Sequence, residues 1–118
     1  MQKLIYVASP YRGDYLFNIH MTKEACFHVM EQGHLFFAPH LFYPVMFNDE
    51  SPTQREQAMK LARQMMLKCD ELWCFGSKIS EGMELEIAFA KEHGVPISYK
   101  KFPEYIPKKK PQQGMQLC

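Results

Sequence analysis

Apolar residues follow two different periods along the chain. Short runs rich in β-branched and aromatic residues predict buried strands at 3–9, 34–38, 71–75 and 95–100. Between these strands, apolar residues recur at helical spacing and predict helices at 14–32, 51–68 and 83–93. A Ser-Pro-Thr-Gln sequence at 51–54 predicts a capping box at the start of the second helix. The stretch 42–50 is aromatic but has no period, so we expect a long loop there.

Strands that alternate with helices imply right-handed crossovers and a parallel sheet with helices on both faces. We therefore expect an α/β domain over residues 1–100, with a flavodoxin-like three-layer α/β/α architecture and a four- to five-stranded parallel sheet. Such sheets bind ligands beyond the carboxyl ends of their strands, next to the loops at 9–14, 39–49 and 76–82. Residues 101–118, rich in lysine and proline, are predicted to form a tail outside the domain.

One acid breaks the pattern of the helix predicted at 83–93. Glu86 falls on its apolar face, together with Met83, Ile87, Phe89 and Ala90, whereas the other glutamates fall on the opposite face. A buried carboxylate is costly unless it is paired or hydrogen-bonded, so such positions are candidates for chemistry. Glu86 is therefore the leading catalytic candidate. The alternative is a structural carboxylate that is bonded to Tyr6 or to a backbone group.

Composition narrows the class of protein. The 118 residues are 47% hydrophobic and 23% charged, as in an ordinary globular domain, and the net charge of +1 provides no basic field for a nucleic-acid polymer. No signal peptide or membrane span is visible, so we expect no membrane association. The cysteines show no paired spacing, and Cys26, Cys69 and Cys74 lie in apolar contexts. We therefore expect small buried thiols and a cytoplasmic location.

Metal chemistry has no signature in the chain. The histidines show no zinc spacing, and neither His-Glu-x-x-His nor Cys-x-x-Cys is present. We therefore expect no metal and no other cofactor.

Two loops have features of anion sites. The first strand ends in Ser9-Pro10 and leads, through Tyr11, Arg12 and Gly13, to a helix N-terminus, where backbone N–H groups and the helix dipole favour a phosphate. Arg12 would add a planar guanidinium suited to phosphate oxygens. A plain turn with a surface arginine is the alternative interpretation.

The second loop leads to the helix that carries Glu86. Ser80 is a suitable N-cap, and Gly82 allows a ligand to approach the first turn closely. Glu86 follows one turn later and would face the same cleft. Capping alone is the alternative role for Ser80.

These sequences together resemble a known family. Tyr6-Val-Ala-Ser-Pro-Tyr-Arg-Gly, Ala38-Pro-His, Cys69-Asp-Glu-Leu-Trp and Ser80-x-Gly-x-x-x-Glu-x-Ala-x-Ala are similar to the nucleoside 2-deoxyribosyltransferase superfamily, most closely to a bacterial and phage branch of it. The resemblance covers about residues 3–99, and its most specific part is the spacing of Ser80, Gly82 and Glu86. It implies a flavodoxin-like fold, a small-molecule nucleoside or nucleotide as ligand, and assembly as a homodimer or higher homo-oligomer.

The resemblance also implies roles for individual residues. Glu86 matches the nucleophile that attacks the anomeric carbon of a deoxyribose, and Tyr6 matches the tyrosine that orients it. Ser80 matches a phosphate-contacting serine of the branch that hydrolyses 2'-deoxynucleoside 5'-monophosphates. Arg12, Gly13 and Gly82 fall at positions that surround the phosphate in that branch.

Three further residues are expected near the substrate. His40 and Asp70 are candidates to protonate or hydrogen-bond the leaving base, and Tyr11 is a candidate to stack on it. Each has a purely structural alternative, in packing or capping. Where the family carries an aspartate that holds the sugar hydroxyls, this chain has Ala62.

Three interpretations of the function remain open at this point. One is cleavage of the N-glycosidic bond of a 2'-deoxynucleoside 5'-monophosphate, or deoxyribosyl transfer, through a covalent intermediate on Glu86. The second is a non-catalytic module that sequesters or senses a nucleotide-derived ligand, which the alanine at position 62 favours. The third is a structural protein whose pocket is vestigial.

Overall fold

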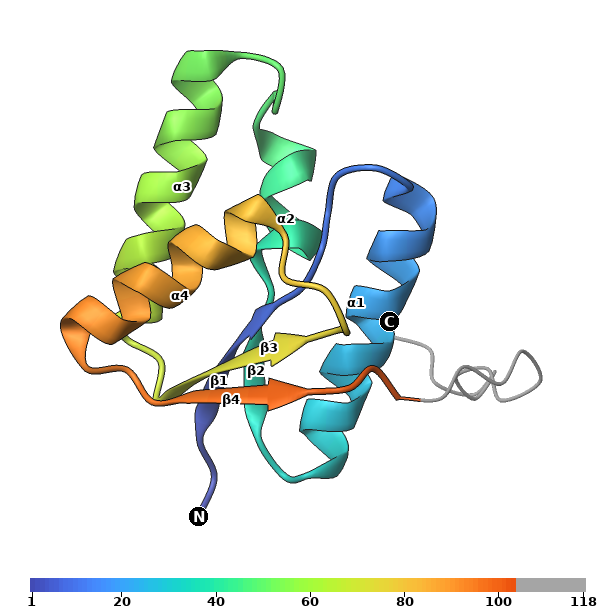
Figure 1. The fold of residues 1–118 in the computed structure, drawn as a ribbon, viewed down its shortest axis with the longest axis vertical. Coiled ribbons are helices and arrows are strands. Elements are labelled where there is room, and N and C mark those ends of the chain that lie inside the picture. Colours follow the sequence, from blue (N-terminus) through green and yellow to red (C-terminus); the bar gives the residue numbers. More distant parts are fainter. Residues whose placement is uncertain (104–118) are drawn as a thin grey trace.

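Four parallel strands form the central sheet of the computed structural model, which describes residues 1–103 (Figure 1). The strands are β1 (Leu4–Ala8), β2 (Leu35–Phe37), β3 (Glu71–Phe75) and β4 (Ile97–Lys100). Their order across the sheet is β2-β1-β3-β4, and every pairing is parallel. The chain builds outward from β1 to β2 and then crosses to the other side for β3. This reversal creates a switch point beyond β1 and β3, where α/β sheets bind ligands.

Helices cover both faces of the sheet, which confirms the three-layer flavodoxin-like architecture. They are α1 (Tyr15–Glu31), α2 (Pro39–Met46), α3 (Pro52–Met66) and α4 (Glu81–His93). α1 packs on one face, whereas α3 and α4 pack on the other. In Figure 1, α2 and the first turns of α3 project beyond the edge of the sheet. These projecting helices form the walls of the site described below.

β1 shows why the sheet needs both helical layers. Residues 5–8 of this strand are almost fully buried. Side chains on a strand point alternately to opposite faces, so Tyr6 and Ala8 join the core under α3 and α4, whereas Ile5 and Val7 join the core under α1. This accounts for the unbroken apolar run that predicted the strand.

The helix boundaries follow the expected caps in most places. The Ser51 hydroxyl accepts a hydrogen bond from the Gln54 N–H at 3.3 Å, and α3 begins at Pro52 as predicted. The Gln54 side chain bonds the N–H of Asn48 rather than that of Ser51, so the capping box is not closed reciprocally. α4 ends at Gly94, whose φ of 72° lies in the left-handed region that favours glycine.

Two predictions about the second β-α unit were wrong. β2 was expected as a buried strand over 34–38, but it has three residues at the edge of the sheet, with Leu35 54% exposed. The segment expected to be a loop over 42–50 contains most of α2, which extends from Pro39 to Met46. Proline at the start of a helix is pre-set for helical φ, and packing against α1 supports this short helix.

The remaining predictions concern cysteines, the membrane and the tail. Cys26, Cys69 and Cys74 are buried and free, as expected. Within residues 1–103, no helix has the length and apolar character needed to cross a bilayer. Most of the tail predicted at 101–118 lies outside the described residues, which end at position 103.

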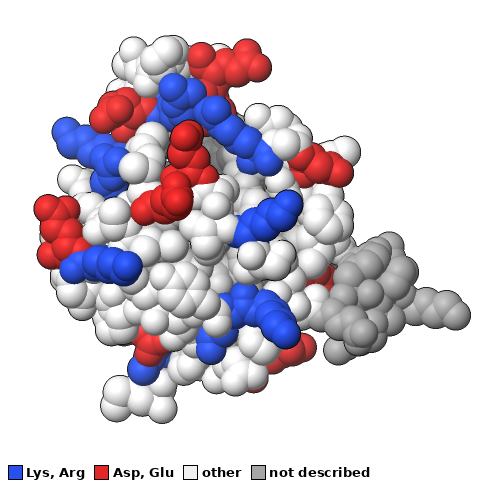
Figure 2. All heavy atoms as spheres, in the orientation of Figure 1, with Lys and Arg blue, Asp and Glu red and all other residues white. Residues whose placement is uncertain are grey.

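The charged side chains of both signs are interspersed on the face shown in Figure 2.

Candidate active site

A pocket of about 600 Å³ lies between α2, α3 and the N-terminus of α4. All three loops that were expected to hold ligands contribute to it, through Tyr11 and Arg12, through Pro39 and His40, and through Ser80. α3 forms a long wall from Arg55 to Met66. The volume is within the usual range for small-molecule sites.

Glu86 occupies the floor of this pocket. One carboxylate oxygen, Oε2, accepts a hydrogen bond from the Tyr6 hydroxyl at 2.6 Å. The other oxygen, Oε1, is buried and has no hydrogen-bond partner among the described residues. An unpaired buried carboxylate oxygen destabilises the folded protein, so its presence here indicates a functional rather than a structural role for Glu86. Tyr6 holds the carboxylate in place through Oε2 only.

The environment of Glu86 changes its acidity. Burial raises the pKa of Glu86 to about 7, and the hydrogen bond from Tyr6 opposes this shift. Burial and the neighbouring Glu86 carboxylate raise the pKa of Tyr6 well above its ordinary value, so the phenol stays protonated and donates. A carboxylate with a pKa near neutrality, in a pocket, is characteristic of functional sites.

The N-terminus of α4 provides backbone donors at the same pocket. The Ser80 hydroxyl accepts a hydrogen bond from the Met83 N–H at 3.2 Å, and the Ser80 carbonyl accepts from Glu84. The N–H groups of the first turn that have no partner within the helix remain for a ligand. At Gly82, open space surrounds the position that a Cβ would occupy, so a ligand can approach the backbone there.

Tyr11, Arg12 and His40 line the opposite side of the mouth. The Tyr11 ring stacks on the His40 ring, with centroids 4.9 Å apart. Arg12 forms an ion pair with Asp49 at 3.0 Å, which joins the loop after β1 to the loop before α3. Burial lowers the pKa of His40 to about 4, so its imidazole is neutral at pH 7. A neutral His40 can hydrogen-bond a leaving base but is a weak acid for protonating it.

The structure corrects the expectation for three of the ten candidate residues. Asp70 precedes β3 and therefore lies at the amino end of the sheet, where its carboxylate accepts a hydrogen bond from the Leu4 N–H at 2.8 Å. Ser9 is fully buried, and its hydroxyl lies 2.6 Å from the Thr22 hydroxyl. Gly13 has a φ of +103°, so it serves the turn before α1. Neither Asp70, Ser9 nor Gly13 lines the pocket.

The position of Ser9 leads to a testable expectation. Ser9→Ala should lower the free energy of unfolding by about 1 kcal/mol, because it deletes a buried hydrogen bond. Thr22 still donates to the Asn18 carbonyl, so no polar group is left unpaired. Denaturant unfolding measures the loss. An unchanged free energy of unfolding in the variant would show that this hydrogen bond makes no net contribution to stability.

Sequence reasoning missed two arginines of α3. Arg55 and Arg63 both line the pocket and are half-buried. They share a helical face with Met59, Ala62 and Met66, which also line it. Two arginines spaced eight residues apart on the face that carries these apolar residues were the available signal. Ala62 does lie in the pocket wall, where it offers only a methyl group.

Among the described residues, no group of three or more histidine, cysteine, aspartate or glutamate side chains is arranged to hold a metal ion.

Comparisons with known proteins identify the family and the fold. A family model described as a domain of unknown function, DUF7768, matches residues 3–100. A search of curated proteins found no match to the chain. Among solved structures, the chain is similar to a 2-deoxyribosyltransferase from the psychrotolerant bacterium Bacillus psychrosaccharolyticus, with a TM-score of 0.67 and 21% sequence identity over 89% of this chain and 77% of that one. At this identity, the likeness establishes a shared fold.

Proposed function

This chain belongs to the DUF7768 family and shares its fold with a 2-deoxyribosyltransferase, and from these two premises we propose that it acts on an N-glycosidic bond. The substrate we propose is a 2'-deoxynucleoside 5'-monophosphate. The reaction is hydrolysis or transfer of the deoxyribosyl group through a covalent intermediate on Glu86.

A single observation carries this proposal: the Glu86 carboxylate lies on the pocket floor with one oxygen held by Tyr6 and the other unpartnered. In the ionised state, Oε1 attacks the anomeric carbon and forms a glycosyl ester, and the C–N bond breaks with its electron pair leaving on the base. Water, or a second base, then attacks the same carbon and releases Glu86. The proton that water loses neutralises the departed base. A buried anion also stabilises the positive charge that develops on the sugar ring.

The other walls of the pocket suit the remaining parts of such a substrate. The first turn of α4, with Ser80 and Gly82, would hold the 5'-phosphate, and Arg12 would keep its Nη2 contact with Asp49 while another of its N–H groups donates to a phosphate oxygen. The base would lie against Tyr11 and His40, with a hydrogen bond from the neutral imidazole. Ala62 leaves the sugar hydroxyl without a carboxylate partner from α3.

We also propose a homodimer or higher homo-oligomer. α1 and α2 expose large apolar side chains, with Leu16 84% and Val45 86% exposed. Contact with a second subunit would remove these side chains from water.

The free buried thiols fit the cytoplasmic location that we propose.

Direct detection of the free base tests the proposed reaction. The protein is incubated with each of the four 2'-deoxynucleoside 5'-monophosphates, and the products are separated by chromatography. Free base should appear with at least one of them. If no base appears but a nucleotide raises the melting temperature, the protein binds without turnover, and the enzymatic proposal is replaced by a nucleotide-binding role. If neither occurs, the site does not take nucleotides.

The pKa of Glu86 predicts how the reaction depends on pH. The attacking form is the ionised carboxylate, which dominates above its pKa, so the rate should rise as the pH increases through about 7. Tyr6→Phe removes the hydrogen bond that opposes the raised pKa, so the midpoint of the rise should move to higher pH. At pH 7 the variant should be at least about tenfold slower, with recovery at higher pH. A midpoint that does not move in the pH–rate profile of Tyr6→Phe would contradict the role given to this tyrosine.

A further inference from the structure

Two arginines on α3 have no place in the reaction proposed above. Arg55 and Arg63 lie about two turns apart on the pocket-facing side of the helix, and both side chains are half-buried. Neither guanidinium has an ion-pair partner among residues 1–103. The only side-chain hydrogen bond that Arg55 makes within this range is to the backbone carbonyl of Asp49, at 3.4 Å. An arginine that is partly removed from water without a carboxylate partner is well placed to bind an anionic ligand.

The acidic residues of the pocket do not neutralise these arginines. Asp49 is paired with Arg12, and the carboxylate of Glu86 is bonded to Tyr6. Glu56 and Glu81 also line the pocket, but both are exposed, so water solvates their charges. The α3 wall therefore presents two positive charges to the pocket interior.

The position of Asp49 relates these charges to the phosphate site. Arg12 contacts the carboxylate of Asp49, and Arg55 contacts its backbone carbonyl, so the two guanidiniums converge on the same residue. Arg12 is proposed to contact the 5'-phosphate bound at the first turn of α4, whereas Arg55 belongs to the α3 wall. A second anionic group next to the 5'-phosphate would therefore lie close to α3.

From these contacts we infer that Arg55 and Arg63 form a second anion-binding position, separate from the N-terminus of α4. This inference rests on the proposed function and specifies its ligand further: the preferred nucleotide carries a second phosphate group. The second phosphate replaces the contact between Arg55 and Asp49 and receives hydrogen bonds from the guanidiniums of α3. A planar guanidinium donates two parallel hydrogen bonds to phosphate oxygens, which a lysine cannot reproduce.

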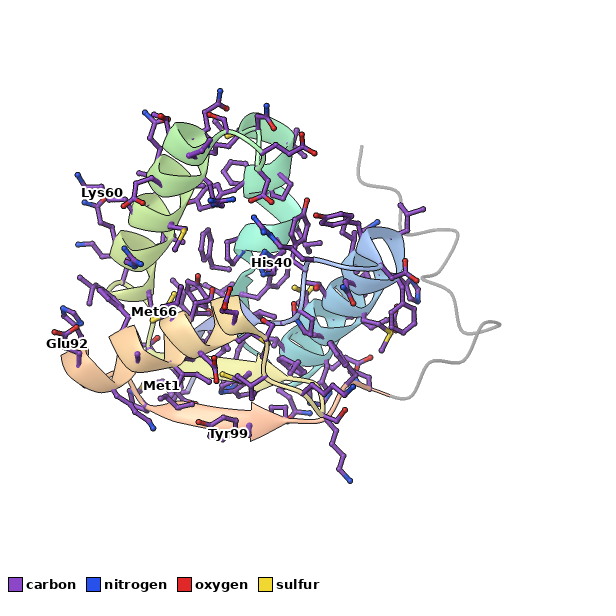
Figure 3. The ribbon with its side chains drawn as sticks, turned by 45° about the horizontal axis from the view of Figure 1, so that its top comes forward. Met1, His40, Lys60, Met66, Glu92 and Tyr99 are labelled. Atoms are coloured by element: carbon purple, nitrogen blue, oxygen red, sulfur yellow. The ribbon has the colours of Figure 1, made fainter. Side chains whose placement is uncertain are left out.

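Affinity measurements with nucleotides of one and two phosphates test the inference. The probes are the 5'-monophosphates, 5'-diphosphates and 3',5'-bisphosphates of the four deoxynucleosides, titrated calorimetrically into Glu86→Gln protein to prevent turnover. Arg63→Gln and Arg55→Gln are each added to this background. Lys60→Gln is the matched control, because Lys60 is an exposed cation of the same helix that does not line the pocket. Figure 3 shows Lys60 on the outer side of α3, away from His40.

The expected pattern separates the second position from the first. A nucleotide with two phosphates should bind at least about tenfold more tightly than its monophosphate, and each arginine variant should remove about tenfold of that affinity. Monophosphate affinity should change less than twofold, and Lys60→Gln should alter neither. Comparison of the diphosphate with the bisphosphate shows on which sugar oxygen the second phosphate is carried.

Three results would overturn the inference: no preference for a second phosphate of either kind, an equal loss of monophosphate affinity in the arginine variants, or the same loss in Lys60→Gln. An equal loss would place the arginines in the first phosphate site. Thermal unfolding of each variant verifies that it is folded. Release of base from monophosphates by the wild-type protein is a separate measurement, so this inference can fail while the proposed reaction stands, and the reverse.

Discussion

Glu86→Gln should abolish release of the base, with a fall in rate of at least about a thousandfold, while the nucleotide still binds. Glutamine has nearly the same shape as glutamate and can accept the hydrogen bond from Tyr6, so the pocket floor is preserved. Its amide oxygen is a very poor nucleophile and carries no charge to stabilise the developing cation on the sugar. The variant therefore removes the reaction and leaves the binding surfaces of α3 and α4 in place.

Glu84→Gln is the matched control for this experiment. It makes the same chemical change two residues earlier on α4, at an exposed glutamate that does not line the pocket. Base release is followed by chromatography, and binding by the increase in melting temperature that the nucleotide causes. Glu84→Gln should behave as the wild type in both assays. If Glu86→Gln retained more than a tenth of the wild-type rate, Glu86 would not be the nucleophile, and the mechanism would have to be assigned to another group.

The Glu86→Gln substitution should also stabilise the folded protein at alkaline pH. The pKa of Glu86 is about 7 in the folded protein and near 4.5 when the chain is unfolded. Between these values the folded protein binds a proton that the unfolded chain has lost, so stability falls as the pH rises from about 4.5 to about 7. The difference corresponds to about 3 kcal/mol of destabilisation above pH 7. A glutamine at this position does not ionise, so the variant lacks this loss.

Urea unfolding at pH 4 and at pH 8 measures the effect. Wild type and Glu86→Gln should be nearly equal in stability at pH 4, where the carboxyl group is protonated in both the folded and the unfolded chain. At pH 8 the variant should be more stable, by about 3 kcal/mol. Equal differences at both pH values would show that the ionisation of Glu86 is not coupled to folding. Replacement of a buried active-site acid is expected to increase stability while it removes activity.

Several features followed from local sequence alone. The bounds of β3 were predicted to the residue, because a continuous apolar run between polar segments defines a buried strand. The direction of Glu86 was also predicted, since positions on a helix repeat about every 100° and Met83 and Ala90 define the buried face. The caps at Ser80 and Gly94 were visible for the same reason, as they depend on one turn of chain.

The placement of Asp70 could have been deduced and was missed. His40 follows a strand, whereas Asp70 precedes one. In a parallel sheet these two positions lie at opposite ends of the strands, the carboxyl end and the amino end. Both residues flank apolar runs, which made them look equivalent in the sequence. The direction of the strand distinguishes them.

Other features depend on contacts between segments that are distant in the chain. The exposure of β2 follows from the order of the strands, which no single strand encodes. α2 is a short helix that is supported by its packing on α1. The low pKa of His40 is caused by burial in the assembled pocket.

The helix α3 shows which features follow from local sequence and which depend on tertiary packing. The N-cap and the apolar spacing of the sequence predicted the helix α3. The positions of residues around the axis of α4 predicted that the acid Glu86 faces inward. These are properties of a few consecutive residues. Whether Arg55 and Arg63 face water or a ligand depends on how far α3 extends beyond the sheet and how close α2 lies opposite it. Those distances are set by the packing of the whole domain, and this is why the α3 wall of the pocket emerged only from the assembled fold.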